Sequence, residues 1–489
     1  MKGHIRTAAV AVVLVGALAA TSAACSSGPP DPSVPLVSAP AAASPANSAD
    51  VTVPPLSTAG SSSRSTAIRT TSPASRSARS SAKPTAPRVT STVAAGSGGA
   101  LKITKADVTA ATVAVAKMTP EQVAGSVLMV TSVDLLGADG PTDQQVGGAI
   151  LGGSGGVLDG TGVGTPDQVS ALTAKLQQGR PRGTPKLLIG TDQEYGDVTR
   201  LVNGFTAFPG ASQLAAIPDT DQAVALTRTI ASAAAQEMLA VGVTVDFAPD
   251  ADVLPADGSE SAIGDRSYGS DPERTALLST AAVVGYQRGG VAATLKHFPG
   301  IGRIAADTHE SLPTLVTDCA GWNATEAVPM RSGIRAGVAL VMTGHVLMPA
   351  VGATTVPASL SPNVVTDLLK GAGRDGCEGM GFDGIAVTDS LLMQPVLDAS
   401  PKPGGAEVQA LLAGEDLLLM STDPAAAVDA ITAAVADGTL PRERLTDAAV
   451  RVYALRLALD RIKRPPMSVI ASPAHQELAD QAAQLAGTG

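Results

Sequence analysis

The sequence is poor in aromatic residues and in positive charge. One tryptophan, four tyrosines and five phenylalanines occur among 489 residues, so a folded core has to be built mainly from alanine, valine and leucine. With 51 glycines and 35 prolines, this composition predicts a globular domain joined to a segment without stable structure. The formal net charge of -10 argues against a nucleic acid as the partner.

Sequence motifs that hold metals or phosphates are also missing. None of the three cysteines lies in a CxxC or comparable ligand spacing, no HExxH occurs among the five histidines, and no GxxxxGK[ST] is present. We therefore expect no metal and no cofactor. Cys319 and Cys377 are the cysteines beyond the N-terminal segment. In an oxidising compartment they either form a disulfide or stay as separate thiols, and the sequence leaves both possibilities open.

Residues 1–24 have the three-part layout of an export signal. Two basic residues precede an apolar run over residues 8–20, and small residues end the segment. The apolar run is too short to span a bilayer. Cys25 follows directly and resembles the lipobox of bacterial lipoproteins, in which this cysteine is lipidated, although Ser22 stands where that pattern favours leucine. We predict an exported protein anchored to the outer face of the cell membrane through Cys25, the alternative being ordinary cleavage before an incidental thiol.

The composition changes sharply after the signal and again near residue 100. Residues 25–100 are rich in Ser, Thr, Pro and Ala and lack the apolar content that would offset the entropy of chain ordering. We interpret them as a disordered linker. Residues 101–464 form the predicted catalytic domain, and residues 465–489 form a C-terminal tail that either packs as a short helix or remains loose.

Beyond residue 100, short apolar runs alternate with alanine-rich helical stretches. This pattern indicates repeated strand-helix units around a parallel sheet. Eight such units over about 350 residues predict an α/β fold of the (β/α)8 barrel type, as in triose-phosphate isomerase. The predicted strands span residues 126–131, 148–151, 186–190, 243–247, 291–295, 339–343, 384–387 and 416–420.

Ionisable residues follow five successive apolar runs. A single aspartate after a strand commonly caps the next helix, but five such cases indicate one shared site at the strand ends. The densest stretch is Lys296-His297-Phe298-Pro299-Gly300, where we expect the fifth strand to end at Leu295 and a loop to begin. The residues concerned are Asp192 after the third run, Asp250 and Asp252 after the fourth, Lys296 and His297 after the fifth, His345 after the sixth and Asp389 after the seventh.

From about Met118 to Leu459 the chain resembles family 3 glycoside hydrolases, most closely their single-domain bacterial β-N-acetylglucosaminidase branch. Several separate motifs carry the resemblance. They are Met118-Thr119-Pro120-Glu121-Gln122-Val123-Ala124-Gly125, similar to the family's entry helix; Thr191-Asp192-Gln193-Glu194 with Arg200; Ile263-Gly264-Asp265-Arg266-Ser267-Tyr268-Gly269; Lys296 to Gly300 with Asp307-Thr308-His309; and Val387-Thr388-Asp389-Ser390-Leu391-Leu392-Met393.

The resemblance implies a catalytic set and a sugar-binding set. Asp389 would be the nucleophile, His309 the general acid and base, and Asp307 its orienting partner, placed on the same side of an extended loop by the two-residue step. Retaining hydrolysis needs a carboxylate that forms a glycosyl-enzyme and a proton donor for the leaving oxygen, and these residue types supply both. The residues expected to hold the sugar are Asp192, Arg200, Arg266, Lys296 and His297.

Larger family members take their acid from a second domain, whereas the last strand-helix unit here closes near residue 461. This favours His309 as the acid over Glu194 or Glu310, which we interpret as ordinary helix or loop carboxylates. The chain also departs from the family pattern. Ile301 stands where a second histidine is usual, so part of the loop's polar network is missing. Tyr195 and Asp197 replace a glycine and an arginine, and we expect them to narrow the sugar pocket or alter its charge.

The leading hypothesis is a retaining exo-β-N-acetylhexosaminidase that removes terminal β-linked N-acetylglucosamine from cell-wall-derived glycosides through a glycosyl-Asp intermediate. We expect a monomer whose partners are small amino-sugar glycosides or muropeptide fragments. The lone Trp322 offers little aromatic platform for a long polysaccharide. Two alternatives stay open: a β-N-acetylglucosaminide phosphorylase, because a histidine acid opposes an incoming phosphate less than a glutamate would, and an inactive tethered carbohydrate-binding lipoprotein.

Overall fold

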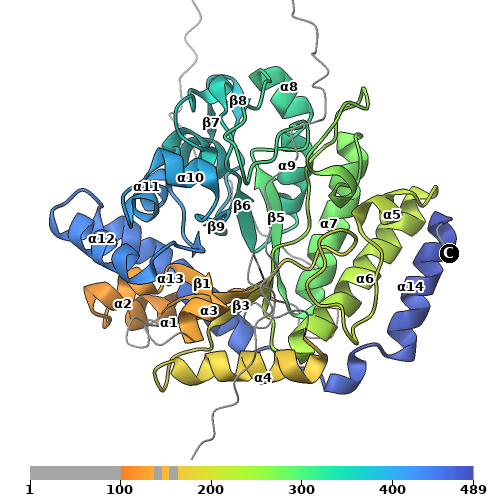
Figure 1. Ribbon diagram of the computed structural model, residues 1–489, viewed down its shortest axis with the longest axis horizontal. Coiled ribbons are helices and arrows are strands. Elements are labelled where there is room, and N and C mark those ends of the chain that lie inside the picture. The colour runs from red at the N-terminus through yellow and green to blue at the C-terminus, as the bar shows by residue number, and fades with distance from the viewer. Residues whose placement is uncertain (1–100, 137–145, 153–163, 488–489) are drawn as a thin grey trace, which may run out of the picture. The chain divides into compact units, whose positions relative to one another are not determined.

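The computed structural model describes residues 101–136, 146–152 and 164–487, and Figure 1 shows their arrangement. The predicted signal segment, the lipidation site Cys25 and the linker to residue 100 lie outside these ranges, so they stay predictions. Within the described ranges, no helix has both the length and the apolar character needed to cross a membrane.

Eight parallel strands form the centre of the fold. Their order in the sheet is β10-β1-β2-β3-β4-β5-β6-β9, and a parallel bridge between Val387 and Leu417 brings the two edge strands together. The sheet therefore curves round to a (β/α)8 barrel, which confirms the predicted fold. The strands are β1 (Leu128–Thr131), β2 (Gly148–Leu151), β3 (Leu188–Thr191), β4 (Val245–Asp246), β5 (Ala292–Phe298), β6 (Leu340–Thr343), β9 (Ile385–Thr388) and β10 (Leu418–Leu419).

Each barrel strand overlaps the range predicted for it, but the predicted end of the fifth strand is wrong. β5 continues through Lys296 and His297 to Phe298. The two polar side chains can stay in a buried strand because each reaches a carboxylate, as described below. A short antiparallel hairpin, β7 (Gly373–Arg374) with β8 (Cys377–Glu378), was not predicted.

Side chains on the strands alternate between the barrel interior and the layer beneath the helices, as the pleat of a strand requires. In β1, Met129 packs inside with Phe247, whereas Leu128 and Val130 pack outside. Gly190 of β3 leaves the room for this inner packing, because a Cβ there would lie 2.5 Å from Met129 Cε and 2.9 Å from the ring of Phe247. The interior is thus filled, and only the strand ends are open to a ligand.

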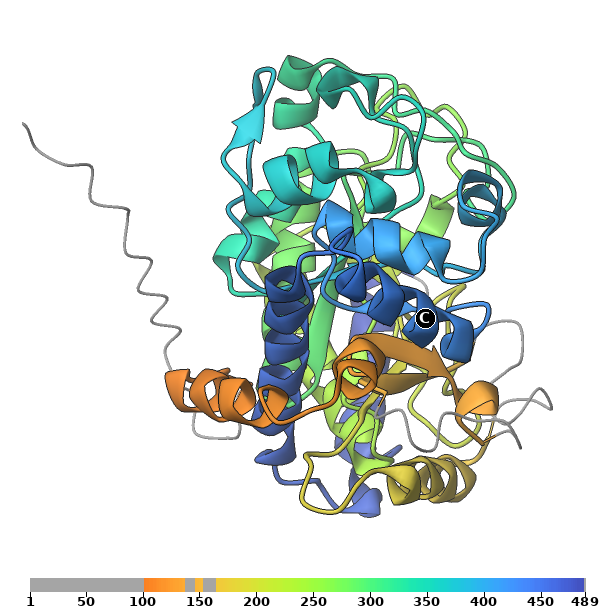
Figure 2. The ribbon, with the colours of Figure 1, turned by 90° about the vertical axis from the view of Figure 1, so that its left-hand side faces the viewer.

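The helices form a layer around the strands (Figures 1 and 2). Thr104, Thr119 and Thr165 begin three of them with a capping box, in which the threonine and the residue three positions later satisfy each other's backbone N–H. The α-helices are α1 (Lys105–Val115), α2 (Pro120–Gly125), α3 (Ser132–Leu136), α4 (Pro166–Leu176), α5 (Ala211–Ala215), α6 (Thr220–Ala240), α7 (Pro272–Gly289), α8 (Cys319–Ala324), α9 (Ala327–Arg335), α10 (Gln394–Ala399), α11 (Gly405–Ala413), α12 (Pro424–Ala436), α13 (Arg442–Asp460) and α14 (Pro473–Ala486).

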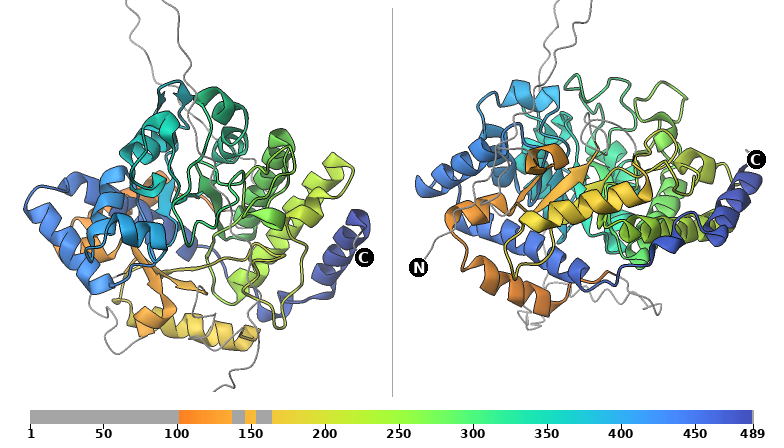
Figure 3. Two further views of the ribbon diagram at one scale, coloured as in Figure 1. Left: turned by 45° about the horizontal axis from the view of Figure 1, so that its top comes forward. Right: turned by 60° about the horizontal axis from the view of Figure 1, so that its bottom comes forward.

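Long-range contacts fix both ends of the described chain to the barrel. In Figure 2, α1 lies beside α13, and Arg461 Nη2 donates to Asp107 Oδ2 over 2.9 Å. In Figures 1 and 3, α14 lies beside α6, so the segment after residue 464 packs as a helix, which is one of the two alternatives that the sequence left open. Cys319 of α8 and Cys377 of β8 form a disulfide, which settles the other open point.

Candidate active site

A cavity of about 730 Å³ lies at the C-terminal ends of the barrel strands. All eight residues that the sequence suggested for catalysis and sugar binding line it. They reach it from the end of β5 and from the segments that follow β3, β4, β5 and β9. The structure thus brings the predicted residues together at the end of the barrel where enzymes of this fold carry their chemistry.

Glu194 is the centre of a buried ion cluster in this cavity. Its carboxylate accepts from Arg266 Nε at 2.9 Å and from Arg266 Nη2 at 3.0 Å. Lys296 Nζ lies 2.6 Å from Glu194 and 3.1 Å from Asp192. Burial alone would raise the pKa of Glu194, but Lys296 and Arg266 lower that pKa to about 2. The cluster therefore holds both cations in fixed positions, with their charge largely matched.

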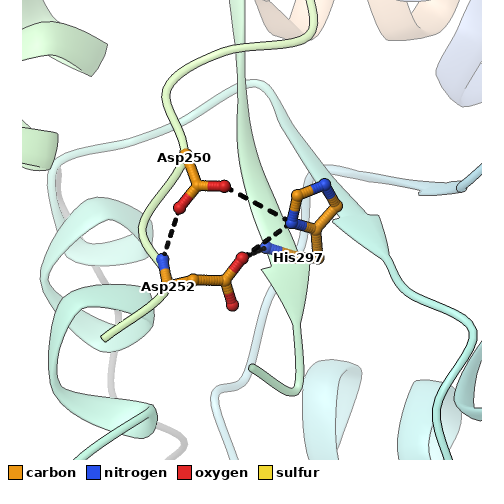
Figure 4. A group of neighbouring side chains, drawn as sticks. All are labelled: Asp250, Asp252 and His297. Atoms are coloured by element: carbon orange, nitrogen blue, oxygen red, sulfur yellow. Dashed lines mark hydrogen bonds and ion pairs between the residues drawn. The ribbon is translucent and has the colours of Figure 1, made fainter. Parts of the chain in front are cut away.

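His297 is oriented by two aspartates from the segment after β4, as Figure 4 shows. Its Nδ1 lies 2.7 Å from Asp252 Oδ2 and 3.6 Å from Asp250 Oδ2. A carboxylate at Nδ1 makes that nitrogen the donor, which leaves Nε2 toward the cavity and 3.4 Å from Arg266 Nη2. The other oxygen of Asp252 accepts the backbone N–H of Ile301 at 2.6 Å. Asp252 thus positions both the imidazole and the loop that follows β5.

These three side chains also form the one group, among the described residues, whose carboxylate and imidazole atoms lie close enough together for a shared metal ion. Both oxygens of Asp252 already accept hydrogen bonds, from His297 and from Ile301. Burial, strengthened by the charge of Asp252, raises the pKa of Asp250 well above its usual value. Because both oxygens of Asp252 are engaged, Asp252 is a poor metal ligand, and we assign the group to orienting His297.

Asp389 directly follows β9 and lies partly buried in the cavity wall. Its Oδ1 accepts the backbone N–H of Ser390 at 2.7 Å. Burial would raise the pKa of this carboxyl, but His345, His297, the N–H of Ser390 and Lys296 together outweigh burial and hold the pKa below its usual value. His345 is fixed by Ser359 Oγ at 2.8 Å and by the carbonyl of Ser390 at 2.9 Å. Asp389 is therefore ionised, as a nucleophile has to be.

The pair Asp307 and His309 lies on the loop after β5. Asp307 Oδ1 accepts from the backbone N–H of His309 at 2.8 Å and from its Nδ1 at 2.7 Å. The predicted contact is present, but the segment is a turn and not an extended loop, because one carboxylate oxygen reaches both donors. Nδ1 is thereby engaged, which leaves Nε2 free to exchange a proton. Both side chains are open to solvent, at 69% for His309 and 56% for Asp307.

Arg200 and a set of apolar side chains line other parts of the cavity wall. Arg200 Nε is buried and finds no acceptor among the described residues, so a sugar hydroxyl could satisfy it. Apolar residues that line the cavity include Ile150, Ile301, Met342, Leu392, Met393 and Met420. Their presence gives the pocket a mixed character, with charges on one part of the wall and aliphatic surface on another.

The departures from the family pattern lie elsewhere than expected. Neither Tyr195 nor Asp197 lines the cavity. Tyr195 is buried against Phe208, and Asp197 is exposed. The prediction that they narrow or recharge the pocket is therefore wrong for the wall itself, because the turn at 195–197 points these side chains away from it. Ile301 does line the cavity, and its backbone is held by Asp252.

Sequence reasoning missed the two carboxylates that organise the site. Glu194 was interpreted as an ordinary carboxylate, which is wrong, because it holds both Arg266 and Lys296. Asp252 was noticed after the fourth strand but was given no role. The only local signal was the position of each carboxylate beside a strand end. Arg266 lies 72 residues from Glu194 along the chain, and His297 lies 45 residues from Asp252.

Known proteins resemble this chain over most of the barrel. Residues 140–455 match the glycosyl hydrolase family 3 N terminal domain. A β-hexosaminidase of Chromobacterium violaceum is 36% identical over 284 residues, which cover 57% of this chain and 75% of that protein. The solved family 3 β-N-acetylglucosaminidase of Paenibacillus sp. str. FPU-7 is 35% identical with a TM-score of 0.65, covering 76% of this chain and 69% of that one. A β-glucoside phosphorylase, at 22% identity, shares the fold with a TM-score of 0.66 over 78% of this chain and 66% of that one. The chain belongs to glycoside hydrolase family 3, and it is a glycoside hydrolase.

Proposed function

We propose that the protein is a retaining exo-β-N-acetylhexosaminidase that releases terminal β-linked N-acetylglucosamine from small glycosides. One observation carries the proposal: an ionised Asp389 lines the same cavity as the hydrogen-bonded pair of Asp307 and His309. The names of the bacterial relatives, a β-hexosaminidase and a β-N-acetylglucosaminidase, support the choice of sugar.

The reaction runs in two displacements at the anomeric carbon. In the first, Asp389 attacks that carbon while the protonated His309 gives its Nε2 proton to the glycosidic oxygen; the bond to the leaving group breaks and a glycosyl ester forms. In the second, His309 takes a proton from water as the water oxygen attacks the same carbon, and the ester bond breaks. Asp389 is restored as a carboxylate and the anomeric configuration is retained.

The cations in the cavity wall recognise the sugar, and the position of Trp322 favours a small leaving group. Arg200, Arg266 and Lys296 each offer several donors to sugar hydroxyls, and Asp192 offers an acceptor. Trp322 is fully buried and donates to the carbonyl of Pro299 at 2.8 Å. It therefore provides no stacking surface for a polysaccharide chain, which fits a protein that removes one terminal sugar at a time.

We also propose that the substrates are cell-wall-derived glycosides or muropeptide fragments met outside the cell, where a lipid on Cys25 would hold the protein to the membrane as a monomer. The export signal and the lipobox resemblance in the sequence support this. Replacing Cys25 with serine should move the protein from the membrane fraction to the medium; an unchanged membrane fraction would contradict lipid anchoring.

Release of 4-nitrophenol from its β-N-acetylglucosaminide and its β-glucoside by the full-length protein tests the activity. Asp389→Ala should lower the rate by about 10³-fold or more, whereas Asp429→Ala, an exposed aspartate of α12, should leave it unchanged. Equal rates for Asp389→Ala and the wild type would overturn the assignment.

The same assay with added phosphate addresses the phosphorylase alternative. We expect no phosphate dependence, because the Asp307 carboxylate lies beside His309, and hydrogen bonds from His309 lower the pKa of Asp307 and keep it charged. That negative charge would oppose an incoming phosphate. Formation of sugar 1-phosphate would establish the phosphorylase instead, and sugar binding without any turnover would establish the inactive binding protein.

A further inference from the structure

Tyr195 stands where the resembling family segment has glycine, at a backbone position suited to glycine. Its φ is 65°, in the left-handed region that side chains with a Cβ seldom adopt. The ring is nevertheless buried, and it meets Phe208 edge to face with ring centroids 5.5 Å apart and planes at 88°. The strain of a tyrosine at this position has to be offset by a stabilising contact elsewhere. The edge-to-face contact with Phe208 is one such contact.

The turn that carries Tyr195 also carries sugar-site residues. Glu194 N–H donates to the carbonyl of Val198 at 3.0 Å, and Tyr195 pairs with Val198 in an antiparallel bridge. Glu194 points to Arg266 and Lys296, Tyr195 points to the core, and Arg200 follows two residues after Val198. A displacement of the Tyr195 ring would therefore move Glu194, which holds Arg266 and Lys296 by ion pairs.

The C-terminal segment completes the surface against which Tyr195 packs. Phe208 also contacts the imidazole of His475 from α14, with ring centroids 6.0 Å apart. His475 Nδ1 is 2.7 Å from Glu237 of α6, and Ala471 N–H donates to the same carboxylate at 3.0 Å. Phe208 thus contacts a ring of α14 and the ring of the sugar-binding turn, so the three rings form one continuous aromatic row.

Glu237 joins this row to the loop beneath the turn. Its carboxylate, fully buried, accepts the backbone N–H of Thr206 at 3.0 Å and the Thr206 hydroxyl at 2.5 Å. The loop then touches the turn directly, because a Cβ added to Gly210 would lie 3.0 Å from Gly196 Cα. Two routes, the aromatic row and the loop, therefore connect α14 to the turn.

We propose that α14 positions the sugar-binding segment 192–200 through His475, Phe208 and Tyr195, so that these are positioning residues for the reaction. None of the three lines the cavity. They act through the turn that holds Glu194 and Arg200. The proposal rests on the proposed function for its kinetic readout, and it assigns a role in substrate affinity to a helix outside the barrel.

The test compares full-length variants by KM, kcat and thermal midpoint with the 4-nitrophenyl β-N-acetylglucosaminide. Tyr195→Gly, which restores the family residue and removes the ring, and His475→Ala should each raise KM about tenfold, because a small misplacement of binding groups has a large effect. kcat should change less than twofold, since Asp389 and His309 are not held by the row. Tyr195→Phe keeps the ring and should retain the wild-type KM.

The matched control is Gln476→Ala, one residue further along α14 and exposed, which should change nothing. The double variant of Tyr195→Gly with His475→Ala should raise KM by less than the product of the two single effects, because both changes interrupt the aromatic row. A lower thermal midpoint with unchanged KM in Tyr195→Gly and His475→Ala would overturn the proposal and leave only a packing role.

Affinity for N-acetylglucosamine, measured by calorimetry on the same variants, separates this proposal from the proposed function. Weaker binding in Tyr195→Gly and normal binding in Tyr195→Phe would uphold the positioning role even for a protein without turnover. Equal binding by the wild type and Tyr195→Gly would contradict the positioning role, whatever the hydrolysis assay shows.

Discussion

Two groups of charged side chains line the cavity, and they are built in opposite ways. The cluster of Glu194, Arg266 and Lys296 is enclosed by the barrel end, with the side chains of Glu194 and Lys296 only 4% and 3% exposed. The pair Asp307 and His309 is open to solvent and is joined by two hydrogen bonds within one turn. Ion pairs between distant segments of the chain hold the first group together. Hydrogen bonds within one turn hold the second group together.

In the proposed mechanism, this difference separates sugar recognition from proton transfer. Buried charges keep their geometry because each is balanced by its neighbours, so they can present donors to a sugar without rearranging. A proton carrier has to meet both a leaving group and water, and an exposed imidazole with one nitrogen free can do so. Substitutions in the first group should therefore cost stability and affinity, whereas substitutions in the second should cost rate alone.

Among substitutions in these two groups, the largest expected effect on rate is that of His309→Ala. Loss of the general acid and base should lower kcat by about 10²- to 10⁴-fold, with the thermal midpoint unchanged because the side chain is exposed. Glu310→Ala, at the exposed neighbouring position, is the matched control and should keep normal kinetics. Equal losses in both variants would point to a disturbed loop and not to a proton carrier.

Glu194→Gln should show the opposite behaviour. The change leaves Lys296 and Arg266 with less compensating charge in a buried site, which should lower the free energy of unfolding by about 3–5 kcal/mol and raise KM. Denaturant titration measures the first effect and steady-state kinetics the second. Glu310→Gln should stay within about 0.5 kcal/mol of the wild type; a similarly small change in Glu194→Gln would show that the cluster is not the rigid part of the site.

The pH dependence of stability sharpens the same contrast. The folded protein lowers the pKa of Glu194 from 4.5 to about 2, so its stabilising contribution is complete above pH 4.5 and is lost as the pH falls toward 2. The free energy of unfolding should decline in this window for the wild type and decline less in Glu194→Gln. Parallel curves for the two proteins would contradict the assignment of the low pKa to Glu194.

The smallest effect expected is that of Asp307→Asn. The amide oxygen can still accept from Nδ1, but a hydrogen bond to a charged carboxylate becomes a weaker neutral one, so kcat should fall about tenfold to hundredfold. The thermal midpoint should not move. A loss as large as that of His309→Ala would mean that Asp307 takes part in the chemistry and does more than orient its partner.

The barrel could be predicted from the sequence because each strand is a short apolar run bounded by helical stretches. The prediction failed where polar residues belong to a buried strand. Lys296 and His297 were assigned to a loop, because no local pattern shows that they will pair with Glu194 and Asp252. The β7–β8 hairpin escaped notice because it contains two-residue strands without an apolar pattern.

The candidate site was predictable to the extent that its residues follow strands or match family motifs. The ion pairs and hydrogen bonds within the site were not predictable, because they join distant segments and depend on how the sheet closes. Tyr195 illustrates the limit: from sequence it was placed near the pocket wall, yet its backbone turns the ring into the core, where it meets Phe208. Only the fold shows that a departure from the family pattern joins the site to α14.

The most direct test of the account is to trap the covalent intermediate with a 5-fluoro N-acetylglucosaminyl fluoride and to map the labelled peptide by mass spectrometry. The account predicts one attached sugar per chain, on the peptide that carries Asp389, and no label in Asp389→Ala. A label on Glu194 or Asp307, or continued hydrolysis without any label, would contradict Asp389 as the nucleophile.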